Sequence, residues 1–207
     1  NATIVKPLTL STGQADLINA VNALSANGST NIQDGIKKAD DELTAHGTFD
    51  CVTSRSIVLL TDGVANRTGN DQSCTSGQNG TCIQSAITAA NNAKTTTVSS
   101  VVYNNQIFSV GLFGAISGTD QTNAEYTLNN IQSGGSFFTE NAANLTGIYN
   151  QIFTQLSWVA QQITGTPFDK ETVSNDFTIG AVTPSKGTAS VSGQVISWNI
   201  DFLNVET

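Results

Sequence analysis

The sequence is poor in charged residues, above all in basic ones. Charged residues make up 12% of the 207 residues, and 8 Lys and Arg are outnumbered by 16 Asp and Glu, so the formal net charge is −8. A basic surface is what a protein uses to bind the phosphates of nucleic acid or an anionic membrane. The composition therefore argues against both kinds of partner.

Side chains that commonly carry catalysis are also scarce. His46 is the single histidine, and its place at the polar end of an expected helix favours a charge near the helix C-terminus over a general base. No Ser-His-Asp or Cys-His set can be assembled around it. The glycines of Gly111-Leu112-Phe113-Gly114 lack the Lys and the Ser or Thr of a phosphate-binding loop. We therefore predict that the chain is not an enzyme.

Long apolar runs are missing too. The longest, Ile57–Leu60, is far shorter than the ~18 residues that a membrane helix needs, so we expect no membrane span. The sequence opens at Asn1 in a β-like run, without Met or a signal peptide. We expect it to be a piece of a longer protein.

Neutral polar residues take the place of charged ones. Thr, Asn, Ser and Gln account for 82 residues, while 38% of the residues are hydrophobic, which is enough to form a folded core. Such a composition favours an extracellular or cell-surface protein. Sequons for N-glycosylation point the same way, although a chain rich in Asn, Ser and Thr also contains such triplets by chance. The five sequons begin at Asn1, Asn27, Asn66, Asn79 and Asn144.

Three cysteines lie in or beside one segment rich in Gly, Asn and Ser. The spacing of Cys74 and Cys82 could close a small disulfide loop outside the cell, with Cys51 as an alternative partner or a free thiol. Zinc binding is disfavoured because no paired Cys-x-x-Cys spacing occurs.

Alternating apolar patterns predict an α/β fold. Continuous apolar segments indicate buried strands, and apolar residues at helical spacing indicate amphipathic helices. Because the two alternate, we expect a mostly parallel sheet with helices on both faces. The expected strands are 3–5, 56–60, 107–112 and 136–139; the expected helices are 17–24, 32–46, 83–94, 122–132 and 142–158; 64–82 is an expected loop, and the pattern of 95–105 favours neither type.

The pattern changes near Ala160. Short alternating strands at 189–191 and 195–200, separated by turns, indicate antiparallel β structure. This predicts a first domain over residues 1–160, incomplete at its N-terminus, and a β-rich segment over 161–207. So few strands bury little core alone, so the segment is either docked or part of a β-sandwich domain.

Four motifs occur in an order typical of one known family. A Gly-x-Thr loop precedes a helix, a hydrophobic strand ends in Thr-Asp-Gly, a later strand reads Phe-x-Val-Gly, and a Gly-Gly turn leads to the last strand and helix. Over about residues 1–158 the combination resembles the von Willebrand factor A (vWA) domain, which has a Rossmann-like fold. The motifs here are Gly28-Ser29-Thr30, Thr61-Asp62-Gly63, Phe108-Ser109-Val110-Gly111 and Ser133-Gly134-Gly135.

The resemblance implies a metal-ion-dependent adhesion site. In the family this site holds an octahedral divalent cation through oxygen ligands, with Mg²⁺ preferred here and Ca²⁺ or Mn²⁺ as alternatives. Thr30 would supply a hydroxyl and Asp62 a carboxylate, and an acidic residue of the partner would complete the shell. The family's first strand supplies further ligands from an Asp-x-Ser-x-Ser motif, which this sequence lacks. The cation is therefore expected only if the parent protein supplies them; otherwise the site is empty.

Each candidate residue also has a simpler explanation. Thr30 could cap a helix N-terminus, and Asp62 could favour a turn before Gly63. Asp34 suits the first turn of a helix through the helix dipole. The acidic run 40–42 most simply forms a solvated helix face.

The stretch 175–200 resembles the repeated β-sandwich modules of bacterial and archaeal surface proteins, which serve as stalks. Some surface adhesins carry a Lys–Asn isopeptide crosslink, but no motif selects a partner for Lys170 or Lys186.

Together the resemblances predict a cell-surface adhesion module that binds a protein or surface ligand bearing an acidic residue. The alternative is a structural filament or surface-layer subunit, in which the fold is a scaffold without a working metal site and neighbouring subunits are the partners. An exported enzyme subunit that uses this domain for recruitment would need a catalytic domain elsewhere.

Overall fold

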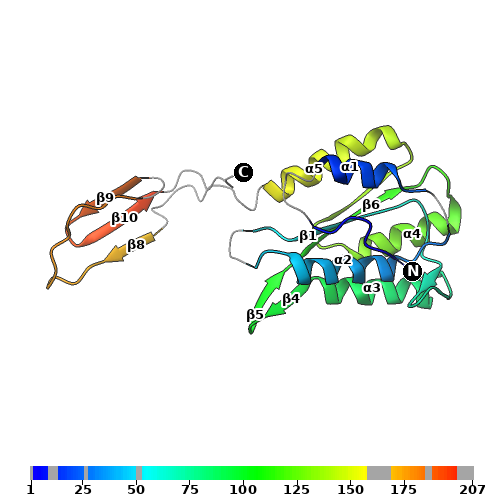
Figure 1. Cartoon of the computed structure of the whole chain (residues 1–207), viewed down its shortest axis with the longest axis horizontal. Helices are drawn as coiled ribbons and strands as arrows, with labels where there is room; N and C mark the ends of the chain where they lie inside the picture. The colour runs from blue at the N-terminus through cyan, green and yellow to red at the C-terminus, as the bar shows by residue number, and fades with distance from the viewer. Residues whose placement is uncertain are drawn as a thin grey trace. The chain divides into compact units, whose positions relative to one another are not determined.

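The computed structural model describes residues 2–8, 14–25, 28–49, 53–157, 169–184 and 188–199. Contacts divide the chain into two compact units, Asn1–Ile152 and Phe153–Thr207 (Figure 1). The domain boundary predicted near Ala160 lies outside the described residues. Within the described part, no helix is long and apolar enough to cross a bilayer.

A three-stranded parallel sheet forms the centre of the first unit. Its strands are β1 (Ser56–Thr61), β6 (Gln106–Leu112) and β7 (Gly135–Thr139), in the order β1-β6-β7. Both ladders are parallel. β6 lies in the middle, and five successive residues, 107–111, are buried, so both of its faces are covered.

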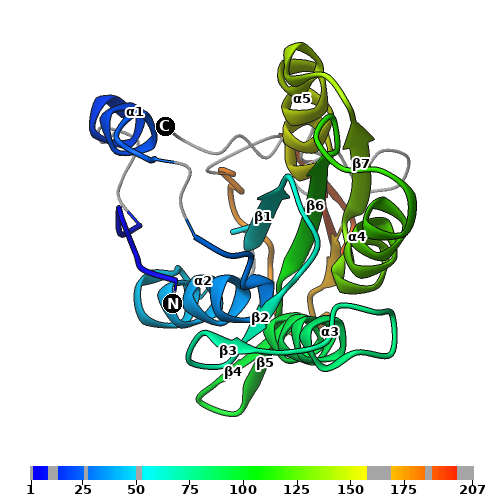
Figure 2. The same cartoon turned by 90° about the vertical axis from the view of Figure 1, so that its right-hand side faces the viewer.

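Helices lie on both sides of this sheet. The described α-helices are α1 (Gln14–Asn22), α2 (Ile32–His46), α3 (Thr81–Ala93), α4 (Gly118–Ile131) and α5 (Leu145–Ser157), the last preceded by the 3-10 helix η2 (Ala142–Asn144). Both views place α2 and α3 on one side, and α1 and α5 on the other (Figures 1 and 2). α4 packs against β6 and β7. The mixed α/β architecture predicted for this part is therefore confirmed.

The core of the first unit forms between three of these helices and the sheet. Ile32 and Ile36 of α2 are four residues apart, so they lie on one helix face, and both are buried. α3 presents mainly alanines, whose small side chains let α2 and α3 pack closely. The other buried members of this core are Ile57, Ala65, Cys82, Ala86, Ala89, Ala90, Ala93, Ile107, Phe113, Ala124, Leu128 and Ile131.

Two short antiparallel hairpins complete the first unit. β2 (Arg67–Thr68) pairs with β3 (Gln72–Ser73) inside the expected polar loop, and β4 (Thr95–Val98) pairs with β5 (Val101–Asn104). Ser99 and Ser100 of the second turn have φ of 50° and 67°. Positive φ at both central residues is the geometry of a type I′ turn, so the undecided segment 95–105 is a hairpin.

The second unit contains an antiparallel sheet of three strands among its described residues. They are β8 (Asp169–Thr172), β10 (Val195–Asn199) and β9 (Thr188–Ser192), in the order β8-β10-β9. The two predicted strands are confirmed, and β8 is additional. Lys186 and the side chain of Lys170, considered for a crosslink, lie outside what the structure describes.

Three sequence-based expectations are corrected. Residues 3–5 form no strand, and Ile4 and Val5 are exposed. α4 begins at Gly118 rather than near 122, because its first turn is polar and leaves no apolar pattern. β1, expected to be a buried strand, is not covered on both faces, because Val58 and Leu60 are 40% and 44% exposed.

Candidate functional site

The carboxyl ends of the three parallel strands form one rim of the sheet. Asp62 follows β1, Phe113 follows β6 and Glu140 follows β7. Asp62 and Glu140 are both exposed. Ligand sites of open parallel sheets lie beyond the carboxyl ends of the strands, so this rim is the expected place for a site.

Three hydrogen bonds join the loop before α2 to the loop after β1. The Thr30 N–H donates to Asn66 Oδ1 at 2.9 Å, across 36 residues of sequence. The N–H groups of Asn66 and Arg67 donate to the carbonyl oxygen of Thr30 at 3.0 and 3.2 Å. The backbone of Thr30 is therefore held at the rim from two sides.

The turn that carries Asp62 borders the hydroxyl of Thr30. The Thr61 hydroxyl donates to the carbonyl oxygen of Gly63 at 3.0 Å, and the Gly63 N–H lies 3.3 Å from the same hydroxyl. A Cβ added to Gly63 would lie 3.4 Å from Oγ1 of Thr30. Thr30 and Asp62 thus lie at the same rim, and the exposed carboxylate of Asp62 has no hydrogen-bond partner among the described residues.

Asn31, and not Thr30, caps α2. Its Oδ1 accepts from the Asp34 N–H at 3.1 Å, which is the usual N-cap hydrogen bond. Its Nδ2 donates to the carbonyl oxygen of Gly69 at 3.2 Å, and the Gly69 N–H donates to Gln33 Oε1 at 2.7 Å. The first turn of α2, which contains Asp34 as predicted, is thereby fastened to the hairpin of β2 and β3.

The rim offers oxygen donors of the kind that bind a hard cation, but few of them. Beside β1 these oxygen ligands are the Thr30 hydroxyl and the Asp62 carboxylate, since Asn66 Oδ1 already accepts the Thr30 N–H. The Glu140 carboxylate follows β7, which is separated from β1 by β6. In the described ranges, no three His, Cys, Asp or Glu side chains group as a metal site. Mg²⁺ prefers an octahedral shell of oxygens, of which several can be waters. Two protein donors fit part of such a shell and do not hold an ion tightly by themselves.

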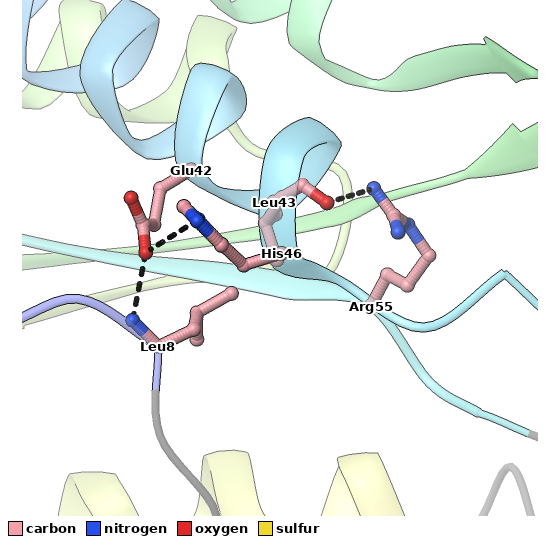
Figure 3. A network of polar contacts seen from close by, with 5 residues as sticks. All are labelled: Leu8, Glu42, Leu43, His46 and Arg55. Atoms are coloured by element: carbon pink, nitrogen blue, oxygen red, sulfur yellow. Dashed lines mark hydrogen bonds and ion pairs between the residues drawn. The ribbon is translucent and has the colours of Figure 1, made fainter.

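A second polar cluster lies at the opposite end of β1, around the buried Arg55. Its guanidinium donates to Asn105 Oδ1 at 2.8 Å and to the carbonyl oxygens of Leu43 and Thr48 at 3.1 and 3.3 Å. Its Cζ also lies 4.0 Å from the centroid of the Phe49 ring. Figure 3 shows Arg55 reaching a carbonyl in the last turn of α2. The Leu43 carbonyl also accepts from the Gly47 N–H at 2.9 Å, so Arg55 adds a second hydrogen bond at the end of α2 and joins it to the start of β1. This cluster therefore has a structural role.

Asp40, also on α2, is electrostatically coupled to this cluster. Its Oδ1 is buried without a hydrogen-bond partner in the described part of the chain. Burial raises the pKa of Asp40, the charge of Asp41 raises it further, and Arg55 lowers it. Burial lowers the pKa of Arg55, against the opposing influence of Asp40. The expectation that run 40–42 is a solvated face is therefore wrong for Asp40, one of whose oxygens is buried, and for Glu42, whose side chain is 15% exposed.

His46 is the last residue of α2, at the helix C-terminus as predicted. Its Nδ1 lies 3.1 Å from Glu42 Oε1, and the same oxygen accepts from the Leu8 N–H at 2.7 Å (Figure 3). Glu42 therefore links the N-terminal segment to α2.

The predicted disulfide between Cys74 and Cys82 is present, with 5.3 Å between the Cα atoms. Cys82 is buried in the first turn of α3. Thr75 supports the same junction, because its hydroxyl and carbonyl oxygens accept from the N–H groups of Thr81 and Cys82, each at 3.1 Å. The disulfide therefore fastens the end of β3 to the start of α3, while Cys51 lies outside the described residues.

Three of the five sequons lie in the described residues. Asn79 and Asn144 are exposed, whereas Asn66 is half-buried at the rim. Asn144 Nδ2 donates to the Thr139 hydroxyl at 3.1 Å. Asn79 is therefore the least constrained of the three, while Asn1 and Asn27 lie outside the described residues.

Two adjoining hollows lie beside the rim, at the end of β7 and the start of α5. Their volumes are 400 and 420 Å³, and they share Phe138, Thr139 and Asn144. Phe138 stacks on the buried Phe113, with 5.7 Å between ring centroids. Most of the residues that line the hollows are polar, and Phe138 is the aromatic residue that both share.

The residues that organise these sites were not all predicted from the sequence. Asn66 was recognised only as a sequon, since nothing local signals a hydrogen bond to Thr30. Glu140 could have been found, because it directly follows a predicted strand. Arg55 stands beside the most apolar run of the chain, and an isolated charge there is a signal for a buried cation.

Comparison of the chain with protein-family models, curated proteins and solved structures finds no match. The interpretation of the rim therefore depends on its own residues.

Proposed function

We propose that the chain belongs to an extracellular adhesion protein of the vWA type, which binds its partner at the rim formed by Thr30, Asp62 and their loops. The observation that carries this proposal is the set of three hydrogen bonds between Thr30 and residues Asn66 and Arg67, with the Thr30 hydroxyl beside the Thr61–Gly63 turn. The sequence motifs alone do not show that Thr30 lies beside the turn that carries Asp62.

Thr30 and Asp62 are the chain's share of a divalent-cation site. The remaining oxygen ligands come from the parent protein, from water and from an acidic residue of the partner. A bound cation would supply positive charge that attracts the partner's carboxylate. By itself the chain binds Mg²⁺ or Mn²⁺ weakly, because it supplies only two of the oxygen ligands of the cation.

An extracellular location is supported by the disulfide Cys74–Cys82 and by the low charge of the surface. Disulfides persist mainly in oxidising compartments. The exposed sequons at Asn79 and Asn144 suit the same location.

Binding of Mn²⁺ alone, measured by electron paramagnetic resonance, tests the proposal without a partner. We expect weak binding that Asp62→Ala abolishes. The matched control is Asp41→Ala, because Asp41 is an exposed carboxylate on α2, away from the rim. Equal Mn²⁺ binding by the wild type and Asp62→Ala would contradict the proposal.

Because the rim offers so few oxygen ligands for a cation, a second function is also considered: a structural filament or surface-layer subunit. In that case the fold is a scaffold, and neither Mn²⁺ nor Asp62→Ala changes what the protein assembles with. Assembly of the intact parent protein in chelator distinguishes the two functions.

A further inference from the structure

The hairpin of β2 and β3 is fastened to the loop and first turn at the start of α2. The Gly69 N–H donates to Gln33 Oε1 at 2.7 Å, and the Thr68 hydroxyl donates to the same oxygen. These bonds add to those between Thr30 and residues 66–67. The first half of the hairpin is therefore the support that keeps Thr30 at the rim.

This hairpin has no buried side chain of its own. Ala65 and Cys82 are both 0% exposed, but none of residues 66–80, all of which the structure describes, is buried. β2 and β3 have two residues each, and a short two-stranded ribbon is marginally stable in water. Its hydrogen bonds to the start of α2 are partly or fully exposed to solvent, and a typical hydrogen bond adds little net stability.

The disulfide supplies the anchor that the hairpin lacks. Cys74 directly follows β3, and its partner Cys82 belongs to the hydrophobic core, against which Cys74 packs. Thr75 adds hydrogen bonds at the same junction, but Thr75 is exposed. A path of direct contacts thus runs from the core through the disulfide and the hairpin to Thr30.

We propose that the redox state of Cys74 and Cys82 controls the rim. With the disulfide closed, the hairpin holds Thr30 for binding of the cation and the partner; with two thiols, the hairpin leaves the start of α2. Closure joins the two Sγ atoms, releases two protons and passes two electrons to the disulfide of a thiol oxidant, which becomes a dithiol. The inference rests on the proposed function of the rim, and it means that the site is completed only in an oxidising compartment.

Reduction opens the hairpin without unfolding the first unit. A free cysteine behaves as a small hydrophobic side chain, so Cys82 keeps its place in the core. Most other members of that core lie on α2, α3, α4 and the sheet. Ala65, buried just before the hairpin, keeps the start of the loop in place. The change is therefore confined to a segment with few apolar contacts, the kind that opens locally.

Backbone order parameters of the full chain, measured by nuclear magnetic resonance, test the opening. For the amides of residues 66–69 we expect a fall from about 0.85, the value of a rigid backbone, to below about 0.6 when a phosphine reductant is added. The double variant Cys74→Ala/Cys82→Ala should show the same mobility without reductant. Leu128, buried on α4, is the reference amide and should stay rigid throughout. Cys51→Ala is the control variant and should respond to reductant as the wild type does.

Electron paramagnetic resonance of Mn²⁺ in the same samples separates this inference from the function on which it rests. Reduction or the double variant should weaken Mn²⁺ binding about tenfold, because a site formed for about a tenth of the time binds about tenfold more weakly. Failure of the proposed function would appear instead as no Mn²⁺ binding by any sample, the oxidised wild type included. The order parameters would then still decide whether the disulfide holds the hairpin.

Three results would overturn the inference. The first is that residues 66–69 stay rigid after reduction. The second is that the oxidised and reduced chains bind Mn²⁺ equally well. The third is that the reduced chain unfolds completely, because the disulfide would then hold the whole first unit rather than the hairpin.

Discussion

At the scale of single residues, Asn66 makes two of the three hydrogen bonds that hold Thr30 at the rim. Its side chain accepts the Thr30 N–H and its backbone N–H donates to the Thr30 carbonyl. The sequence contains both residues in recognisable motifs but not their contact, because hydrogen bonds between distant loops depend on how the strands and helices pack. Thr30, Asp62 and the disulfide could be singled out in advance, whereas the role of Asn66 could not.

Asn66→Ala should destabilise the first unit by about 1–2 kcal/mol, because the partly buried Thr30 N–H loses its acceptor. Urea unfolding measures the change. Asn79→Ala is the control, since Asn79 is exposed, and we expect it to leave stability nearly unchanged. An equal loss in both variants would show that the side chain of Asn66 does not hold the loop.

Asp40 gives a pH-dependent prediction at the same scale. Its pKa is raised in the folded state, chiefly by burial, so the folded protein binds this proton more tightly than the unfolded chain. The contribution of Asp40 to stability is therefore full below its unfolded pKa and is lost as pH rises through its folded pKa.

Asp40→Asn should consequently raise stability at pH 7, and the gain should vanish at a pH below the unfolded value of about 3.9. Urea titrations at the two pH values measure this difference. Asp41→Asn, at an exposed position, should give a smaller gain. A loss of stability at pH 7 in Asp40→Asn would mean that attraction to Arg55 outweighs burial.

At the scale of secondary-structure elements, periodicity predicted the helices and the central strand, because each carries its own apolar pattern. α2 and β6 follow the expected ranges within a residue or two. The same reasoning predicted that β1 is buried on both faces, but Val58 and Leu60 are exposed, since an apolar run does not tell whether both faces of a strand are covered. The hairpin of β4 and β5 was missed because Ser99 and Ser100, rather than Gly or Asn, form its type I′ turn.

The disulfide acts at this scale by holding a long loop against α3. Cys74 and Cys82 close a loop with a sequence separation of 8, for which chain entropy predicts about 2–3 kcal/mol of stabilisation. The double variant Cys74→Ala/Cys82→Ala should therefore unfold at a correspondingly lower urea concentration. Reductant should lower the stability of the wild type and leave the double variant unchanged; a wild type insensitive to reductant would contradict this.

At the scale of the whole molecule, the chain combines an exposed rim with a partly exposed apolar strand, β1. The rim carries the Thr30 hydroxyl and the Asp62 carboxylate, which suit a cation and an acidic ligand. The edge of β1 is apolar and uncharged, which suits a β-strand. Leu60→Lys should therefore leave Mn²⁺ binding unchanged.

The most direct test of the central claim is the location of Mn²⁺ on the chain by nuclear magnetic resonance. Paramagnetic Mn²⁺ broadens the amide signals of residues close to it. If Thr30 and Asp62 form one cation-binding rim, the signals of Thr30, Asp62 and Gly63 should disappear together at the lowest Mn²⁺ concentrations, and should persist in Asp62→Ala. Broadening that begins instead at the acidic residues of α2, with the rim signals unaffected, would contradict the account.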